Sequence, residues 1–499
     1  MLFIGLDLGT SSVKALLMDE SGNIEASCSR GYPCFHRYPG WSEQEPLDWY
    51  KGSIAAIKEL VHGSDVDPLD VRGIGIGGQM HGLVTLDEDD AVIRPAILWN
   101  DGRSEQESEY LNNEIGMDRL SAWCGNIAFP GFTAPKLLWM RKREPDSFNR
   151  IRKVMLPKDY LVYRLSGEFS TDVSDASGTL LFDVRDRCWS VDMLELCGLS
   201  IGQMPEVHES FEPVGTLSPN VARELGLPND VIVVAGAGDN AAAAVGCGAV
   251  EEGQCNISLG TSGTVFLPSN SFRVDDENTL HSFDDATGGY HLMGCILSAA
   301  SAYSWWSEAI LGRNDYAKQE GEIPELGVNP VLFLPYLMGE RSPVNDSEAR
   351  GAFVGMSLDT TQAQMTQAVM EGVAFALRDC FEHAEAMGIR VDRVTACGGG
   401  ARNDVWRSIL ANVLGRSIAL LEHEEGPGFG AGILAMVGCG LYPTVIDAAL
   451  RFNQVSSLVP FDPIIATEYN KRYKKYKELY PALKRVFHSE GSDSHDRAL

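Results

Sequence analysis

The stretch Leu8-Gly9-Thr10-Ser11 near the start of the chain recurs as Leu259-Gly260-Thr261-Ser262 about half a chain later. Each copy follows a short strand-like apolar run and leads into another, so each predicts a β-hairpin with a small polar turn. A chance match is the alternative, because hairpin turns favour Gly and Ser in any case. Self-similarity between two halves is typical of a duplicated unit. The repeat therefore predicts two domains, residues 1–247 and 248–487, followed by a polar tail at 488–499.

The rest of the chain alternates strand-like and helix-like patterns, which predicts an α/β fold. Apolar runs at 71–76 and 231–235 predict strands that lead into glycine-rich turns. Helical patterns are expected at 47–60, 362–387 and 404–414.

Composition excludes several classes of protein. The 499 residues are 44% hydrophobic and 22% charged, which is ordinary for a globular chain. The net charge of −28 argues against an extended surface for nucleic acid or anionic membrane. We expect no membrane span and no signal peptide, and the eleven scattered cysteines predict reduced thiols in a cytoplasmic protein without structural zinc.

Two glycine strings imitate nucleotide-binding motifs. Residues 73–78 and 236–241 both fit the dinucleotide-binding pattern G-x-G-x-x-G/A. Neither opens a clear βαβ unit with an acidic residue about 20 positions later, so neither predicts a Rossmann site. A Walker loop is excluded because the chain contains no Gly-Lys dipeptide.

The paired hairpins offer a different kind of phosphate site. Small turn residues, Thr10 and Ser11 in the first copy and Gly260 and Thr261 in the second, let backbone amides and hydroxyls approach phosphate oxygens closely. Beside the first turn, Lys14 adds a positive charge and Asp7 a carboxylate for water-bound Mg²⁺. The alternative is a pair of surface turns that hydrogen-bond only to themselves.

A third glycine turn lies at 398–400, between a strand-like run and a helix that carries Trp406. Gly399 and Gly400 leave room for a flat ring to lie against the backbone, and Asn403 follows at the start of the helix. An ordinary tightly packed βα loop would show the same residues.

Asp239 is the candidate for acid–base chemistry. It follows the apolar run at 231–235 and precedes an alanine-rich segment. Reactive groups of α/β enzymes lie at the carboxyl ends of strands, and a carboxylate there can accept the proton of a hydroxyl group. The alternative is a simple helix cap, a position that Asp favours.

Two further strings carry candidate sugar contacts. The sequence Gln79-Met80-His81-Gly82 ends a strand-like run, and His81 could hydrogen-bond a sugar hydroxyl or be a structural histidine. Residues 99–103 combine an indole, an amide, Asp101 and the guanidinium of Arg103, a mixture that suits polyol binding. It would equally suit a structural pair between Asp101 and Arg103.

Together these motifs resemble the FGGY family of carbohydrate kinases over nearly the whole chain. Residues 351–356, with the helical residues 364–371, fit the C-terminal signature of that family. Residues 131–140 fit its first signature, except that Arg143 stands where an acid, amide or His is usual. The strings at 78–82 and 94–103 resemble those of the D-xylulose-phosphorylating branch more than those for glycerol or ribulose.

The resemblance implies two ribonuclease-H-like domains of the actin, sugar kinase and chaperone superfamily, with a cleft between them and a last helix that can return to the first domain. It implies ATP-dependent phosphorylation of D-xylulose, feeding the pentose phosphate pathway, in a possible homodimer. Other acceptors (L-xylulose, ribulose, glycerol), a non-catalytic sugar- or ATP-binding regulator and a chaperone-like binding protein remain as alternatives. The roles it implies are as follows: catalysis by Asp239, assisted by Asp7; Mg²⁺ at Asp7 and Asp239 through water; the ketose at Met80, His81, Asn240, Asp101 and Arg103; and ATP at Thr10, Ser11, Lys14, Gly260, Thr261, Gly399, Gly400 and Asn403.

Overall fold

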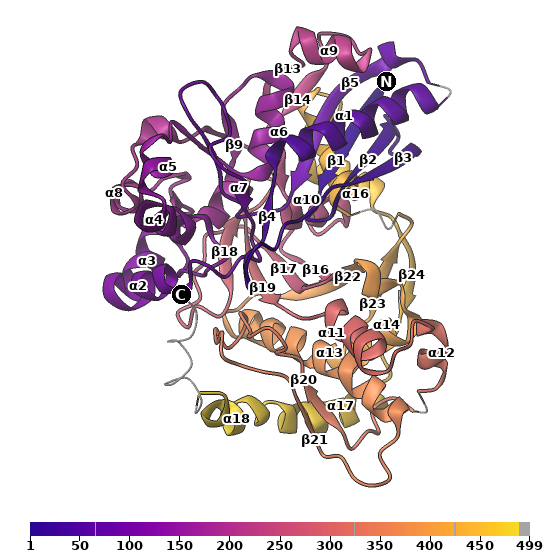
Figure 1. Cartoon of the computed structure of the whole chain (residues 1–499). Helices are drawn as coiled ribbons and strands as arrows, with labels where there is room; N and C mark the ends of the chain where they lie inside the picture. Colours follow the sequence, from indigo (N-terminus) through magenta and orange to yellow (C-terminus); the bar gives the residue numbers. More distant parts are fainter. Residues whose placement is uncertain (65, 324, 424–425, 489–499) are drawn as a thin grey trace.

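Two large mixed β-sheets form the centre of the protein. The computed structural model describes residues 1–64, 66–323, 325–423 and 426–488, so all but the first residue of the expected tail lies outside the described residues. Each sheet has seven strands, and Figure 1 shows the first sheet in the upper part of the molecule and the second below it. The α/β class expected from the alternating patterns is confirmed.

The first sheet has the strand order β13-β14-β5-β1-β2-β3, with β15 beside β5. The hairpin expected around residues 8–11 is confirmed, because β1 and β2 pair antiparallel with Asp7 opposite Lys14. On its other side β1 pairs parallel with β5. The strands are β1 (Leu2–Leu8), β2 (Ser12–Asp19), β3 (Ile24–Gly31), β5 (Val71–Gly78), β13 (Pro213–Thr216), β14 (Ile232–Val234) and β15 (Ala237–Gly238).

The second sheet repeats this arrangement, in the order β18-β19-β17-β16-β22-β23-β24. The hairpin β16–β17, formed by the first two strands of this sheet in the chain, corresponds to β1–β2, and its parallel neighbour β22 corresponds to β5. The repeat thus extends beyond the hairpin to the pairing of the neighbouring strands. The domain boundary at residue 247 stays a prediction. The strands are β16 (Gly253–Leu259), β17 (Gly263–Ser269), β18 (His281–Asp284), β19 (Tyr290–Ile296), β22 (Val391–Cys397), β23 (Ile418–Leu421) and β24 (Val455–Val459).

Helices cover both sheets. On the first, α1 packs against β2 and β3 and α6 against β5, while α15 packs against β1 and β5. On the second, α13 packs against β17 and β19, and α14 packs against α13. The bounds are α1 (Pro46–Gly63), α6 (Pro157–Ser166), α10 (Asp239–Gly246), α13 (Gln362–Ala386), α14 (Asp404–Leu414), α15 (Pro427–Gly438) and α16 (Val445–Phe452). No helix in the described part of the chain is long and apolar enough to cross a membrane.

The segment between β7 and β12, apart from α6, forms a mostly helical lobe beside the first sheet, with its own apolar core. That core also takes Phe283 and Met293 from the second sheet, so the lobe packs against both halves. The remaining elements of the first half are β4 (Glu43–Gln44), β6 (Val84–Leu86), β7 (Ala96–Ile97), α2 (Glu105–Tyr110), α3 (Met117–Cys124), α4 (Thr133–Arg143), α5 (Pro145–Asn149), β8 (Lys153–Met155), β9 (Ser170–Asp172), α7 (Val173–Ala176), β10 (Phe182–Asp183), β11 (Cys188–Trp189), α8 (Val191–Cys197), β12 (Glu206–His208) and α9 (Pro219–Leu225).

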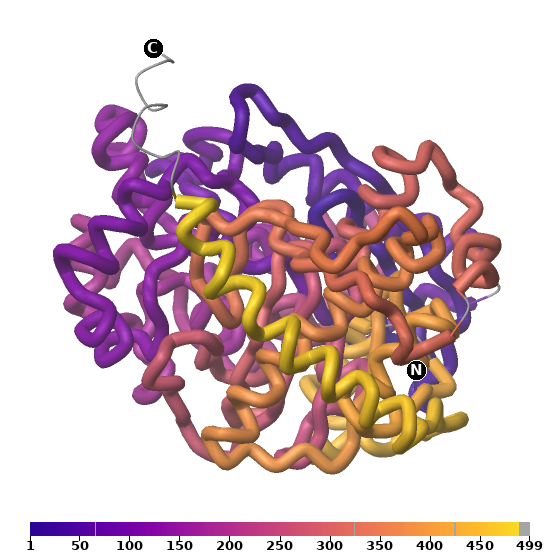
Figure 2. The backbone as a smooth tube through the Cα atoms, turned by 90° about the horizontal axis from the view of Figure 1, so that it is seen from below, coloured from indigo at the N-terminus to yellow at the C-terminus, as the bar shows by residue number. Residues whose placement is uncertain are grey.

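The chain returns to the first sheet through α15 and α16, and not through its last described helix. Both pack in one apolar cluster with Phe3, Leu16 and Met18 of the first sheet. In contrast, α18 places Leu479 and Leu483 against the core of the second half, and Figure 2 shows α17 and α18 in yellow crossing the orange segments. The remaining elements are α11 (Ala300–Ser304), α12 (Tyr316–Gly321), β20 (Leu332–Leu334), β21 (Ala352–Val354), α17 (Pro463–Tyr476) and α18 (Leu479–Phe487).

Glycines allow α10, α15 and the first sheet to touch without side chains between them. A β-carbon at Gly430 of α15 would overlap the carbonyl oxygen of Ala242 in α10, and one at Gly75 of β5 would overlap that of Ala431. The glycine string at 73–78 therefore lies inside β5, where alternate glycines admit α15.

We predict that Gly430→Ala lowers the free energy of unfolding by about 1–3 kcal/mol, because the added methyl group has no space and must separate the two helices. Gly321→Ala is the matched control, because a β-carbon there meets no atom within 4 Å and Ala favours a helix. Urea denaturation measures both. Equal stability of Gly430→Ala and the parent protein would contradict the close contact.

Candidate active site

One cavity of about 420 Å³ is lined by both halves of the chain. The first half contributes Asp7, Lys14, Asp239 and Asn240, and the second contributes the turn at Gly398 and Gly399. Other lining residues are Ala243, Cys247, Ser258, Ala396, Cys397, Ala401, Arg402, Arg407, Leu420, Leu421, His423, Gly426, Pro427 and Gly428. The structure thus brings together five residues that the sequence singled out, from positions far apart in the chain.

The two hairpin turns differ in their surroundings. In the first, the hydroxyl of Thr10 accepts a hydrogen bond of 2.9 Å from the indole of Trp99, while Ser11 is exposed. In the second, the carbonyl oxygens of Gly260 and Thr261 accept the N–H groups of Ala300 and Ala299 at 2.9 and 3.0 Å. None of these four turn residues is among the residues that line the cavity.

The third turn approaches the second hairpin closely. Gly398 has φ 88°, and a β-carbon there would lie 2.8 Å from the backbone of Leu259, so the position needs glycine. Gly399 faces open space, whereas Gly400 is buried against Leu259. Asn403, outside the lining, caps α14 by accepting the N–H of Trp406 at 2.9 Å.

Asp239 lies at the first position of α10, directly after β15. Its Oδ1 accepts hydrogen bonds from the backbone N–H and the side-chain amide of Asn240, at 2.8 and 2.9 Å. Asn240 in turn accepts a bond of 3.1 Å from the hydroxyl of Thr264 on β17. Asp239 is thereby oriented by a residue that itself bridges the two halves.

The surroundings of Asp239 make it harder to ionise than an Asp in water. The side chain lies at the wall of an open cavity, so solvent reaches part of it although protein atoms surround it. Burial raises the pKa of Asp239 to about 6, while the hydrogen bonds from Asn240 act in the opposite direction. A carboxyl group with this pKa is ionised at neutral pH and can still accept a proton effectively.

Met80 and His81 follow the end of β5 and lie outside the cavity lining, beside Asp239 in the fold. Met80 is within van der Waals range of Gly238, because a β-carbon on that glycine would lie 3.0 Å from Met80 Cγ. His81 has φ 67°, its Nδ1 lies 2.6 Å from the carbonyl oxygen of Gly178, and its ring stacks on Phe132. Burial first, and then the charge of Arg341, hold the pKa of His81 well below its usual value, so the ring is neutral.

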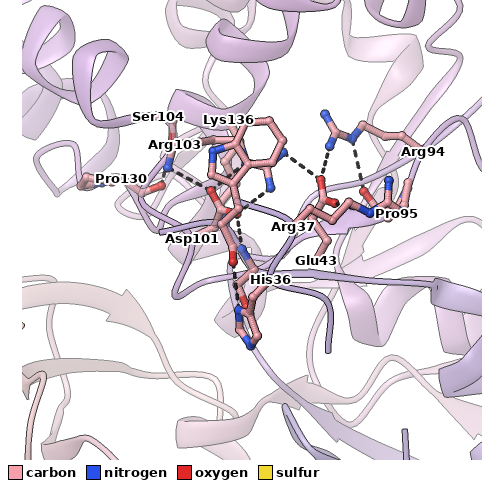
Figure 3. Close-up of polar contacts among 12 residues, drawn as sticks. His36, Arg37, Glu43, Arg94, Pro95, Asp101, Arg103, Ser104, Pro130 and Lys136 are labelled. Atoms are coloured by element: carbon pink, nitrogen blue, oxygen red, sulfur yellow. Dashed lines mark hydrogen bonds and ion pairs between the residues drawn. The ribbon is translucent and has the colours of Figure 1, made fainter. Parts of the chain in front are cut away.

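Asp101 and Arg103 form a buried ion pair. Two guanidinium nitrogens of Arg103 donate to the Asp101 carboxylate at 2.8 and 2.6 Å, as Figure 3 shows. Glu43 accepts a further bond from Arg103 at 2.8 Å, and the ring of Trp41 covers the guanidinium at 3.5 Å. The Arg103 side chain is only 1% exposed. Of the two interpretations of residues 99–103, a structural ion pair and a sugar site, the structural pair agrees with the contacts that Arg103 makes here.

Lys136, which was not among the predicted site residues, fixes the backbone at His81. Its ammonium group is fully buried and donates to the carbonyl oxygens of His81 and Gly131 at 2.8 and 2.7 Å. Lys136 lies within residues 131–140, which fit the first family signature, and this signature could have marked Lys136 as a site residue. The signature does not show which atoms the Lys136 ammonium group reaches.

Arg341 was also missed, because it comes from the second half and reaches the first. Its guanidinium occupies the space beside Gly131 and lies 5.5 and 5.8 Å from the ring centres of Phe129 and Phe132. Within the described residues, no carboxylate forms an ion pair with it. Arg341 therefore brings a positive charge of the second half to the wall that holds His81.

Asp175 is a third residue that the sequence did not identify. Its carboxyl group is fully buried, and neither oxygen has a hydrogen-bond partner. Burial raises the pKa of Asp175 well above its usual value, and the nearby charge of Asp239 acts in the same direction. The charge of Lys158 acts in the opposite direction. Asp175 is thus a buried acid whose surroundings favour the protonated form, on the short helix α7 that packs against β15, the strand before Asp239.

This fold and this cavity define a carbohydrate kinase with an N-terminal and a C-terminal domain, as the comparisons with known proteins establish. The N-terminal domain of the FGGY family of carbohydrate kinases matches residues 2–246, and its C-terminal domain matches residues 255–439. The chain belongs to the FGGY family of carbohydrate kinases, and it is a sugar kinase with ATP as a substrate. The resemblance and the fold predicted from the sequence are confirmed.

Relatives and solved structures agree over nearly the full length. The xylulose kinase of Escherichia coli is 41% identical over 97% of this chain and 99% of its own, and that of Bacillus subtilis is 36% identical over 97% and 96%. A crystal structure of a xyloylose kinase from Brucella ovis matches with a TM-score of 0.92, 41% identity and coverage of 97% of this chain and 100% of that one. The xylulose kinase structure from Rhodospirillum rubrum matches with a TM-score of 0.88, 29% identity and coverage of 98% and 100%.

We predict that Arg103→Met lowers the free energy of unfolding by about 3–5 kcal/mol, because it leaves the Asp101 charge buried without its partner. Arg37→Met is the matched control, since Arg37 also pairs with Glu43 but is 57% exposed; we expect a change within about 0.5 kcal/mol. Urea denaturation measures both variants. Unchanged stability of Arg103→Met together with a raised KM for sugar would instead indicate direct substrate contact.

Proposed function

We propose that the chain transfers the γ-phosphoryl group of Mg²⁺-ATP to the terminal hydroxyl of D-xylulose, with Asp239 as the general base. The observation that carries this proposal is the position of Asp239: an oriented carboxylate at the wall of a cavity that also contains Asp7 and Lys14. The names of the curated relatives, xylulose kinases over nearly the full chain length, support the choice of sugar.

In this reaction the terminal hydroxyl oxygen attacks the γ-phosphorus, and the bond from that phosphorus to ADP breaks. Asp239 takes the hydroxyl proton as the new P–O bond forms. The base contributes about 10²–10⁴-fold, and positioning and charge neutralisation supply most of the remainder. Asn240 contributes by holding one Asp239 oxygen, which leaves the other to face the hydroxyl.

We assign the ketose to the wall formed by Met80, His81 and Asn240, with Arg341 as an additional contact. His81 Nδ1 faces the Gly178 carbonyl, so the opposite nitrogen of the neutral ring is an acceptor for a sugar hydroxyl. Arg341 offers donors to sugar oxygens from the second half. Asp101 and Arg103 act behind this wall as positioning residues, because they form an ion pair in which each neutralises the charge of the other.

We assign the phosphates to the region between the two hairpin turns, with Lys14 as a point charge. Thr10, Ser11, Gly260 and Thr261 remain predictions as phosphate contacts, and their small side chains leave backbone groups accessible. Gly399, which faces open space, is the best-supported of the expected adenosine contacts. Asn403 caps α14, so we assign it an indirect role.

The residues present fit a Mg²⁺ ion that is carried by the nucleotide. Asp7 and Asp239 supply carboxylate oxygens, the donor type that Mg²⁺ prefers, in one cavity. The described part of the chain contains no group of three or more His, Cys, Asp or Glu side chains able to hold a metal by themselves. When bound, the ion supplies neutralisation of phosphate charge, and the two carboxylates would hold it through water.

Sibling acceptors such as L-xylulose, ribulose and glycerol are the main competing assignment, because small changes in the sugar wall alter which hydroxyls are bound. A non-catalytic regulator is disfavoured by the presence of Asp7, Asp239 and both hairpins. The expected homodimer and cytoplasmic location stay predictions.

The decisive experiment measures ADP release with Mg²⁺-ATP and D-xylulose, L-xylulose, D-ribulose, glycerol or no acceptor. We expect strong turnover with D-xylulose and a loss of about 10²–10⁴-fold in Asp239→Asn, because the amide cannot take the proton. Asp192→Asn is the control, since Asp192 is exposed on α8 and is not among the residues that line the cavity. Wild-type turnover in Asp239→Asn would contradict the assignment of Asp239 as the general base. Turnover with another acceptor but not with D-xylulose would contradict the assignment of D-xylulose as the substrate.

The pH dependence follows from the raised pKa of Asp239. The base works only when ionised, so kcat/KM for the ketose should be constant above pH 7 and fall as the pH drops through about 6. Below that value the decline should approach about tenfold per pH unit. A flat profile between pH 7 and pH 5 would contradict the assignment.

For Arg341→Met we expect the KM for D-xylulose to rise by about 10–100-fold, because a charged hydrogen bond to the sugar is lost. The KM for ATP should stay the same, which separates this effect from general damage. Arg350→Met, on the same loop and exposed, is the matched control. An unchanged KM for ketose in Arg341→Met would exclude contact between this guanidinium and the sugar.

A further inference from the structure

Two cysteines, one from each half of the chain, meet in the cavity. Cys247 directly follows α10, the helix that begins at Asp239, and Cys397 is the last residue of β22, next to the turn at Gly398. Both side chains line the cavity, and they hydrogen-bond to each other. We propose that Cys247 and Cys397 are an oxidation site that forms a reversible disulfide across the cavity.

The two thiols have different chemical characters. The hydrogen bond from Cys247 lowers the pKa of Cys397 to about 7, and bonds from Asn256 and Ser258 act in the same direction against burial. The amide of Asn256 donates to Cys397 Sγ at 3.4 Å. The pKa of Cys247 is raised, first by its hydrogen bond to Cys397 and then by burial. Cys397 is therefore the more readily ionised of the two thiols and acts as the nucleophile, and Cys247 is the resolving thiol.

Other buried cysteines lack this combination. Burial raises the pKa of Cys255, Cys295 and Cys380, so these thiols stay protonated and unreactive. Access differs as well, because Cys397 is partly exposed to the cavity, whereas Cys255 and Cys380 are fully buried. A small oxidant that enters the cavity would therefore react first at Cys397.

Hydrogen peroxide is the chemical class of oxidant that this site would take. The Cys397 thiolate attacks one peroxide oxygen, the O–O bond breaks, and hydroxide leaves a sulfenic acid on Cys397. The sulfur of Cys247 then attacks the Cys397 sulfur, the S–S bond forms, and the sulfenic oxygen departs as water. The sulfenic oxygen leaves with the Cys247 proton, and the hydroxide takes up the proton that Cys397 released on ionisation. Two thiols are thus oxidised to one disulfide, and one peroxide is reduced to two waters.

The disulfide would tie the end of α10 to the end of β22. Such a bond holds the two Cα atoms about 4.4–6.8 Å apart, which fixes the two halves on either side of the cavity. It would also occupy space at the turn assigned to adenosine. The resulting loss of activity rests on the proposed nucleotide site, whereas formation of the bond itself does not.

The test treats reduced full-length protein with hydrogen peroxide and reads three quantities: free thiols, intact mass and ADP release with D-xylulose. We expect the loss of two thiols and two hydrogens, a peptide that links Cys247 to Cys397, and loss of most activity that dithiothreitol restores. Prior Mg²⁺-ATP should slow all three changes. Because the linked peptide is read without any activity, failure of the sugar assignment would not be mistaken for failure of the disulfide.

Matched variants separate this site from other thiols. Cys247→Ser and Cys397→Ser should each abolish the linked peptide and the reversible inactivation, measured relative to their own untreated activity. Cys188→Ser, which removes an exposed cysteine, should behave as the parent protein. Absence of the linked peptide from oxidised parent protein would overturn the proposal, and oxidation unaffected by Mg²⁺-ATP would overturn its placement at the nucleotide.

Discussion

The backbone contact between α10 and α15 is the constraint on which the rest of the structure depends. These helices meet where glycine leaves no side chain, with Gly246 and Gly430 against Gly426 and Ala242, while Gly75 lets α15 reach the first sheet. The start of α10 carries Asp239, and the N-terminal end of α15 supplies Gly426 and Pro427 to the cavity. A separation of these two helices would therefore move the candidate base and one cavity wall together. Packing at this crossing thus sets the geometry in which chemistry takes place.

Several features of the site place ionisable groups where burial disfavours their charged forms. Asp175 is buried without a hydrogen-bond partner, Lys136 has a pKa held well below its usual value by burial, and Asp101 and Arg103 neutralise each other's charge. Burial of such groups costs stability unless each finds partners, and here the carbonyl oxygens of His81 and Gly131 serve Lys136. The apolar clusters of both sheets must offset that cost. The benefit is a wall of fixed dipoles around His81.

The sequence predicted the local features well and the distant contacts poorly. Both hairpins, the α/β class and the position of Asp239 after a strand follow from short patterns, because strand periodicity and turn chemistry are local. The string at 99–103 left two interpretations open, since a pair between Asp101 and Arg103 and a sugar contact need the same residue types. Arg341 and the pair Cys247–Cys397 act across separations that no spacing rule connects. Their roles depend on which side chains face each other after folding.

The position of α15 in the chain has a consequence for synthesis on the ribosome. Strands β1 and β2 are made first, but the face that carries Phe3, Leu16 and Met18 is covered by residues from 427 onward. Throughout most of translation that apolar face has no native cover, and contacts of such long sequence separation form slowly. Emerging chains would therefore expose an apolar surface to each other and to chaperones until α15 and α16 are made. Expression yield should then respond to the rate of elongation more than the stability of the finished protein would indicate.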